Sequence, residues 1–80
     1  LNDFAAAEAL YRELIEEKPG DETLLYRYAR CLFVQERYDD AEKMLGAAIR
    51  RNPRYHDAHL LLARVYEKNG QFAAAVFELE

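Results

Sequence analysis

The sequence repeats with a period of 34 residues, and this period constrains the fold more than any other feature. Similar residues recur at that spacing along the whole chain: Phe4, Tyr38 and Phe72; Ala7, Ala41 and Ala75; Pro19 and Pro53; Ala29 and Ala63; Arg30 and Arg64. A fixed period of this length is typical of solenoids, in which each structural unit packs only against its neighbours. Most such arrays are binding scaffolds, so the period indicates a mode of action as well as a fold.

The length and charge of the chain exclude several classes of function. Its 80 residues are enough for one compact unit. Fifteen acidic residues outnumber eleven basic ones, for a net charge of −4. This balance argues against a nucleic-acid partner, which requires clustered Lys and Arg. No apolar run approaches the roughly 20 residues that span a bilayer. We therefore expect neither nucleic-acid binding nor a membrane span.

Cys31 is the single cysteine, so the chain can form no internal disulfide bond. A lone cysteine is compatible with any compartment and favours a reducing one such as the cytoplasm. A catalytic thiol needs a nearby base, and no histidine lies close to Cys31 in the sequence. We expect Cys31 to pack against its own helical hairpin. With no nucleophile–base pair and no metal-ligand cluster evident, we predict that the chain is not an enzyme and has no cofactor.

Proline and glycine mark the boundaries of helices. Pro19 and Pro53 disfavour helical geometry in the residues before them, and Gly70 is typical of a helix C-terminus. Asp21 is a predicted N-cap for the helix that follows it. Between these boundaries apolar residues step by three and four, which is the helical period. The pattern predicts five helices, over 3–18, 22–35, 38–51, 56–69 and 72–80, and no sheet.

Connections of two to five residues make neighbouring helices antiparallel. The predicted fold is therefore all-α, an α-solenoid of helix–turn–helix repeats with five helices. We name the helix before each short turn A and the one after it B, so the order is B, A, B, A, B. The chain lacks an initiator Met and ends within a helical pattern. We expect it to be a segment of a longer array.

The residues at repeated positions resemble the tetratricopeptide repeat family, whose unit is a 34-residue helix–turn–helix. A-helix positions that this family fills with large, Leu-like, small and aromatic residues hold Leu25, Tyr28, Ala29 and Leu32, then His59, Leu62, Ala63 and Tyr66. B-helix positions hold Tyr38, Ala41, Leu45, Ala48 and Pro53, then, in the first helix, Phe4, Ala7, Tyr11, Leu14 and Pro19. The resemblance implies a tetratricopeptide-like superhelix with a partial repeat over 1–21, a full repeat over 22–55 and a partial repeat over 56–80.

Two features of the pattern carry structural expectations. Ala29 and Ala41 should face each other inside a hairpin, because small side chains let two helix backbones approach. A larger residue at Ala41 would overpack that contact at a cost of about 1–3 kcal/mol. The turn glycine, Gly70, is replaced one period earlier by Glu36. If Glu36 is left-handed, the replacement costs about 1 kcal/mol.

The resemblance implies a protein–protein interaction scaffold, in which A helices line a concave groove that takes a peptide or a partner helix. By position, the groove residues are Thr23, Tyr26, Arg27, Arg30 and Phe33, followed by Asp57, Leu60, Leu61, Arg64 and Glu67. Arg30 and Arg64 hold the same place in successive repeats and should project side by side. A subfamily that binds chaperone C-termini uses Lys and Asn at positions that hold other residues in this chain, so we do not expect that activity.

The groove arginines favour an acidic partner. Arg27 and Arg30 have no acidic residue three or four positions away, where helical side chains pair. Guanidinium groups bind carboxylates through two parallel hydrogen bonds, and Tyr26 and Phe33 could hold an apolar anchor. The predicted partner is a protein or peptide that is acidic and carries such an anchor. The alternative is that these arginines are solvated or paired with other helices.

Other features have simpler interpretations. His56 and His59 are spaced like metal ligands, yet two ligands do not make a site, and His59 falls on a packing position. Six acidic residues are expected on a solvated convex face: Glu13, Glu16, Glu17, Asp39, Asp40 and Glu42. An alternative function is structural self-association, in which exposed terminal helices stack on another copy to form a homo-oligomer.

Overall fold

A computed structural model describes residues 3–70, and these residues form four helices and no strand. The helices are α1 (Phe4–Glu17), α2 (Glu22–Val34), α3 (Tyr38–Arg51) and α4 (His56–Lys68). Their bounds agree with the predicted ones to within a residue at each end, which confirms the all-α class. The described chain thus has four helices rather than five, and the predicted helix over 72–80 lies outside the described residues.

The helix ends follow the capping residues. The Asp21 carboxylate accepts hydrogen bonds from the backbone N–H groups of Thr23 at 3.0 Å and Leu24 at 3.3 Å, which confirms the predicted N-cap. Asp3 caps α1 in the same way, accepting from the Ala6 N–H at 3.0 Å. Such caps satisfy N–H groups that have no partner within the helix.

The turns after α2 and α4 use one left-handed residue each. Glu36 has φ 62° and Gly70 has φ 76°, and they are 34 residues apart. Because Gly70 has no Cβ, it adopts this conformation freely, whereas Glu36 does so at a steric cost. Glu36 is therefore left-handed, and the repeat keeps its backbone conformation at this position although the residue differs.

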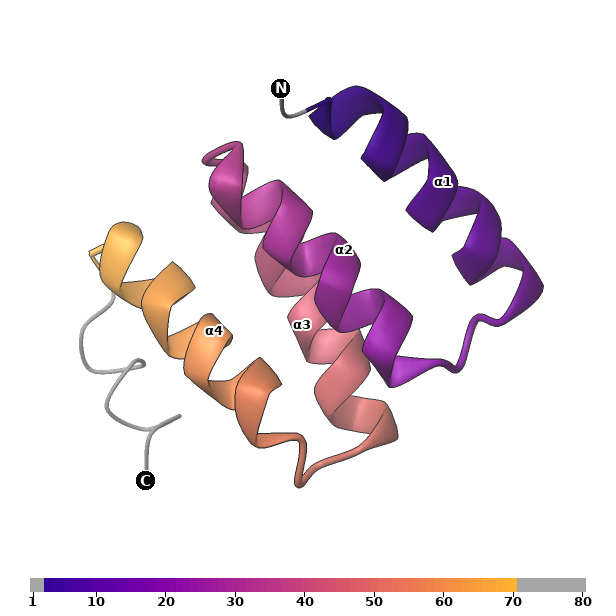
Figure 1. Ribbon diagram of the computed structural model, residues 1–80. Helices are drawn as coiled ribbons and strands as arrows, with labels where there is room; N and C mark the ends of the chain where they lie inside the picture. The colour runs from indigo at the N-terminus through magenta and orange to yellow at the C-terminus, as the bar shows by residue number, and fades with distance from the viewer. Residues whose placement is uncertain (1–2, 71–80) are drawn as a thin grey trace.

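The helices form two layers (Figure 1). α2 packs most extensively on α3, α4 contacts both α3 and α2, and α1 contacts α2. In Figure 1 the helices α1, α2 and α4 lie across the view, and α3 lies behind α2. Ala29 and Ala41 are both fully buried in one apolar cluster with Leu32 and Leu45. This burial agrees with the expected close approach of α2 and α3.

The two ends of the described chain differ in burial. α1 contributes no buried residue, although Tyr11 and Ile15 pack against the edge of the core. α4 buries Ala58, Leu62 and Val65, together with two further residues. α2, α3 and α4 therefore form the core, and α1 lies against its surface.

Candidate binding groove

α2 and α4 enclose a groove of about 470 Å³, which we call the α2–α4 groove. Its walls are formed by Tyr26, Arg30, Phe33 and Val34 from α2, and by Asp57, Leu61 and Arg64 from α4. A smaller adjoining space of about 150 Å³ adds Leu60 to this wall. Both helices are A helices, so the groove runs between equivalent faces of successive repeats.

Most of the predicted groove residues meet in this place. Seven of the ten line the two adjoining spaces: Tyr26, Arg30, Phe33, Asp57, Leu60, Leu61 and Arg64. Arg30 and Arg64 line the same groove, in keeping with their equivalent positions. The sequence pattern missed Val34, which lies one turn after Arg30 and so shares its face of α2.

Three predicted groove residues lie elsewhere. Thr23, near the start of α2, makes a side-chain hydrogen bond with Tyr55. Glu67 is exposed on α4 and lines neither space. Arg27 faces α1 because one residue of helix turns the side chain by about 100° from Tyr26. Membership of an A helix therefore did not suffice to place these side chains in the groove.

Arg27 lines a second space of about 490 Å³, which we call the α1–α2 hollow. On α1 it is lined by Phe4, Ala7 and Tyr11, and on α2 by Arg27, Arg30, Cys31 and Val34. Arg30 and Val34 also line the α2–α4 groove. These two residues therefore form the wall between the two spaces.

The groove has a cationic and an apolar part. Ion pairs within residues 3–70 join only Glu8, Arg12, Arg37 and Asp40, so Arg30 and Arg64 have no carboxylate partner in this part of the chain. The Arg30 guanidinium lies 5.8 Å from the centre of the Tyr26 ring, within cation–π range. Arg30 is therefore held over an aromatic surface while its N–H donors remain available to a ligand.

Tyr26 is less open than the sequence suggested. Its ring is half-buried and packs against that of Tyr55, with ring centres 5.2 Å apart. Burial raises the pKa of Tyr55, and the hydrogen bond with Thr23 opposes this shift. Tyr26 therefore forms part of the groove floor rather than a free anchor, because one of its faces already contacts Tyr55.

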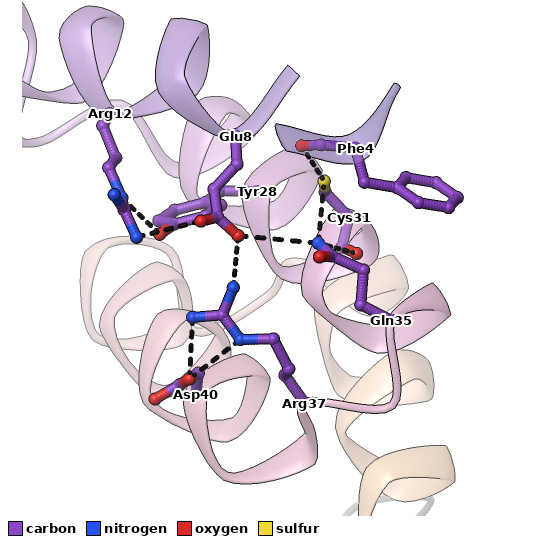
Figure 2. A network of polar contacts seen from close by, with 8 residues as sticks. All are labelled: Phe4, Glu8, Arg12, Tyr28, Cys31, Gln35, Arg37 and Asp40. Carbon is purple, nitrogen blue, oxygen red and sulfur yellow. Dashed lines mark hydrogen bonds and ion pairs between the residues drawn. The ribbon is translucent and has the colours of Figure 1, made fainter. Parts of the chain in front are cut away.

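A polar network on the other side of α2 joins α1 to the turn before α3 (Figure 2). The Glu8 carboxylate accepts hydrogen bonds from Arg12 and Arg37, and Arg37 also donates to Asp40 at 3.1 Å. The Arg12 Nε–H donates to the Tyr28 hydroxyl at 3.1 Å. This network holds α1, which has no buried residue, against the rest of the fold.

The network also explains two pKa shifts. The hydrogen bond to Tyr28 raises the pKa of Arg12, and the charge of Glu8 acts in the same direction. The hydrogen bond to Asp40 is the main cause that raises the pKa of Arg37. Both guanidinium groups therefore remain charged at all ordinary pH values, so these contacts persist across that range.

Sequence reasoning did not find this network. It placed Asp40 among solvated convex-face acids, but Asp40 is half-exposed and ion-paired with Arg37. Glu8 and Arg37 are 29 residues apart. The repeat period relates only residues that are 34 apart, so it did not pair them. The contact could have been predicted from the opposite charges of one B helix, α1, and of the turn that precedes the next B helix, α3.

Cys31 and His59 have structural partners. Contrary to expectation, Cys31 faces α1 rather than its own hairpin, with Sγ 3.8 Å from the Phe4 carbonyl oxygen. His59 Nε2 lies 2.8 Å from the Pro53 carbonyl oxygen. The described residues contain no group of three or more metal-ligating side chains. None of the four helices is long and apolar enough to cross a bilayer.

The described residues form a helical repeat protein in which two successive A helices, α2 and α4, line one groove. Two models of the tetratricopeptide repeat match this sequence, one over residues 1–54 and the other over 34–80. The chain belongs to the tetratricopeptide repeat family. A comparison with curated proteins found no match. Tetratricopeptide repeats generally mediate protein–protein interactions and are typically non-enzymatic modules.

Proposed function

We propose that this protein binds an acidic peptide or partner helix in the α2–α4 groove and catalyses no reaction. The full repeat is assigned to residues 22–55, flanked by partial repeats over 1–21 and 56–80. These divisions fall at the last residues of the loops between α1 and α2 and between α3 and α4. The unit that binds would then combine the A helices of two successive repeats.

The observation that carries this proposal is the pair of arginines, Arg30 and Arg64, on one groove. They come from equivalent positions, are exposed, and have no carboxylate partner within residues 3–70. Although the whole chain has a net charge of −4, the lining of this groove has two basic residues and only one acidic residue, Asp57. Charge complementarity of this kind governs partner choice and association rate.

The ligand chemistry follows from the groove lining. A carboxylate would be held between the guanidinium groups of Arg30 and Arg64 through bidentate hydrogen bonds. An apolar side chain next to it would contact mainly Phe33, which is half-buried and lines the groove beside Leu61. The ligand is therefore a segment with an acidic residue adjacent to a large apolar one.

The test is a calorimetric titration with peptides that carry a Glu–Leu or a Lys–Leu pair in the same background. We expect the acidic peptide to bind and the basic one not to bind. The double substitution Arg30→Glu with Arg64→Glu should weaken binding by on the order of 100-fold, about tenfold for each lost pair. Added salt should weaken the wild-type interaction, because exposed charges are screened.

A matched control changes the net charge by the same amount away from the groove. Lys18 and Arg54 are exposed loop residues, and Lys18→Glu with Arg54→Glu should leave the affinity within about twofold. Circular dichroism of both double variants checks that the helices persist. Equal binding of the acidic and basic peptides, or equal effects of the two double variants, would remove the groove proposal.

Self-association is a second proposal, supported by the exposure of α1. No residue of α1 is buried, and Leu10 on this helix is 55% exposed. Sedimentation velocity over a range of concentrations distinguishes the two functions. A species that stays monomeric at high concentration would exclude a homo-oligomeric role.

A further inference from the structure

The lining of the α2–α4 groove changes chemically along its length. α2 and α4 run in the same direction (Figure 1), so positions along the groove can be ordered by residue number on both helices. In the first turn of α4 the lining includes Asp57. Arg30 and Arg64 follow about two turns later, and Phe33 and Val34 line the end near the C-terminus of α2. The groove is therefore anionic at one end, cationic in the middle and apolar at the other end.

The anionic end contains the smaller of the two adjoining spaces. This space of about 150 Å³ is lined by Tyr26, Asp57, Leu60, Leu61 and Arg64. A cavity of that volume holds a group about as large as a benzene ring. Leu60, one turn after Asp57, is 52% exposed, so an apolar surface adjoins the carboxylate. The space therefore has room for one side chain, with an apolar wall for its stem and an acid for its tip.

The Asp57 carboxylate is available to a ligand. Asp57 is exposed, and the ion pairs within residues 3–70 do not include it. Arg64 is seven residues further along α4, which corresponds to about 10 Å at 1.5 Å per residue. Arg27, which follows Tyr26 on α2, lines the α1–α2 hollow instead of this groove. A cation from a ligand would thus meet an acid that has no ionic partner in the described part of the chain.

We propose that Asp57 and the smaller space form a second subsite of the α2–α4 groove, which takes a lysine side chain of the bound peptide. The methylene chain of that lysine lies along Leu60, and its ammonium group reaches Asp57. The subsite depends on the proposed peptide binding in this groove, and it specifies which acidic peptides bind. Asp57 is then a residue that determines specificity, in addition to the two arginines.

The order of the groove lining determines the order of residues in the ligand. The acidic residue of the ligand lies between Arg30 and Arg64, with Asp57 on one side of it and Phe33 on the other. The lysine and the apolar residue must therefore lie on opposite sides of the acidic residue. In a polyproline II segment, residues three apart share a face and are about 9 Å apart. This spacing matches the two turns from Asp57 to Arg64 and gives the motif Lys-x-x-Glu-Leu.

The test compares three peptides by calorimetric titration at low salt. Each has a Glu–Leu pair in a background of alanine. The first has a lysine three residues before the glutamate, the second has it three residues after, and the third has no lysine. The first two have the same composition and net charge, so they differ only in residue order. We expect the first peptide to bind about three- to fivefold more tightly than the other two, as is typical of one exposed ion pair.

Variants of the chain locate the lysine. Asp57→Asn should remove the advantage of the first peptide and leave the affinity for the third within about twofold. Asp57→Lys should instead favour, by about threefold, a peptide with glutamate in place of that lysine. Glu67→Gln is the matched control, because Glu67 is also an exposed acid of α4 but lines neither space. The advantage of the first peptide should persist in this control.

The outcomes separate the subsite from the groove. Equal affinities for the two lysine peptides, with both weakened by Arg30→Glu with Arg64→Glu, would overturn the subsite and leave the groove proposal standing. An equal loss for all three peptides in Asp57→Asn would also overturn it, because Asp57 would then act only through its favourable charge at the N-terminus of α4. Binding that depends neither on the glutamate of the peptide nor on the two arginines would overturn groove and subsite together.

Discussion

The junction between α1 and α2 and the junction between α3 and α4 occupy equivalent positions one period apart, yet different forces hold them. At the first junction, Arg12 of α1 donates a hydrogen bond to Tyr28 of α2. Glu8 of α1 accepts another from Arg37, in the turn before α3. At the second, the residues equivalent to Arg12 and Tyr28 are Gly46 and Leu62. The period thus fixes where helices lie, while the residues at each position decide whether the contact is polar or apolar.

The two junctions differ on the side where Arg12 bonds Tyr28 at the first and Gly46 faces Leu62 at the second. A hollow of about 610 Å³ lies between α3 and α4, lined by residues that include Gly46, Leu62 and Tyr66. Across this junction the Asn69 side-chain amide donates a hydrogen bond to the Asp39 carboxylate at 3.5 Å. The second junction therefore depends on the apolar side chains of α4. The first combines the stacking of Tyr11 on Tyr28 with a set of polar contacts around Glu8.

The largest expected effect is that of Leu62→Ala. Leu62 is 4% exposed, and loss of its buried methyl groups should destabilise the fold by about 2–4 kcal/mol. Leu60→Ala on the same helix is the control, because Leu60 is 52% exposed and should change stability by less than about 0.5 kcal/mol. Urea unfolding measures both, and equal losses would show that α4 is not held by its apolar face.

Gly46→Ala should stabilise the fold by about 0.5–1 kcal/mol, because glycine is unfavourable within a helix. An added Cβ meets only Arg50 Nη1, at an ordinary contact distance of 3.6 Å. Gly20→Ala is the control, because Gly20 lies in the loop between α1 and α2 and gains nothing from helix propensity. An added Cβ there would lie 2.9 Å from the guanidinium of Arg51. Thermal unfolding should show a higher Tm for Gly46→Ala alone; a lower Tm would mean that close packing at this junction requires the glycine.

Glu8→Gln should have the smallest effect, a loss of about 0.5 kcal/mol, which is typical of a partly exposed ion pair. Arg37 keeps its bond to Asp40 and Arg12 keeps its bond to Tyr28, so the loss is partial. The matched variant Glu42→Gln, one period later, should change stability hardly at all. Urea unfolding at low and high salt compares them, and a loss that is equal for both would contradict the polar character of the first junction.

The sequence predicted the backbone better than the side-chain contacts. The capping carboxylate of Asp21 could be predicted because it acts within a few residues of its own helix. The orientation of Arg27 toward α1 could not, because it depends on how far the helices rotate against each other. The contact of Glu8 with Arg37 was not predicted either, because the two residues hold different positions within neighbouring repeats.

Because α1 buries no residue, this helix can detach at a smaller free-energy cost than any other described helix. Its detachment would break the contacts of Glu8 but leave the apolar cluster of α2, α3 and α4 intact. Local opening of this kind, confined to one cooperative unit, is common at weakly buried segments. The described chain therefore consists of a stable unit of three helices and a first helix that can open separately. Its unfolding should begin at that first helix.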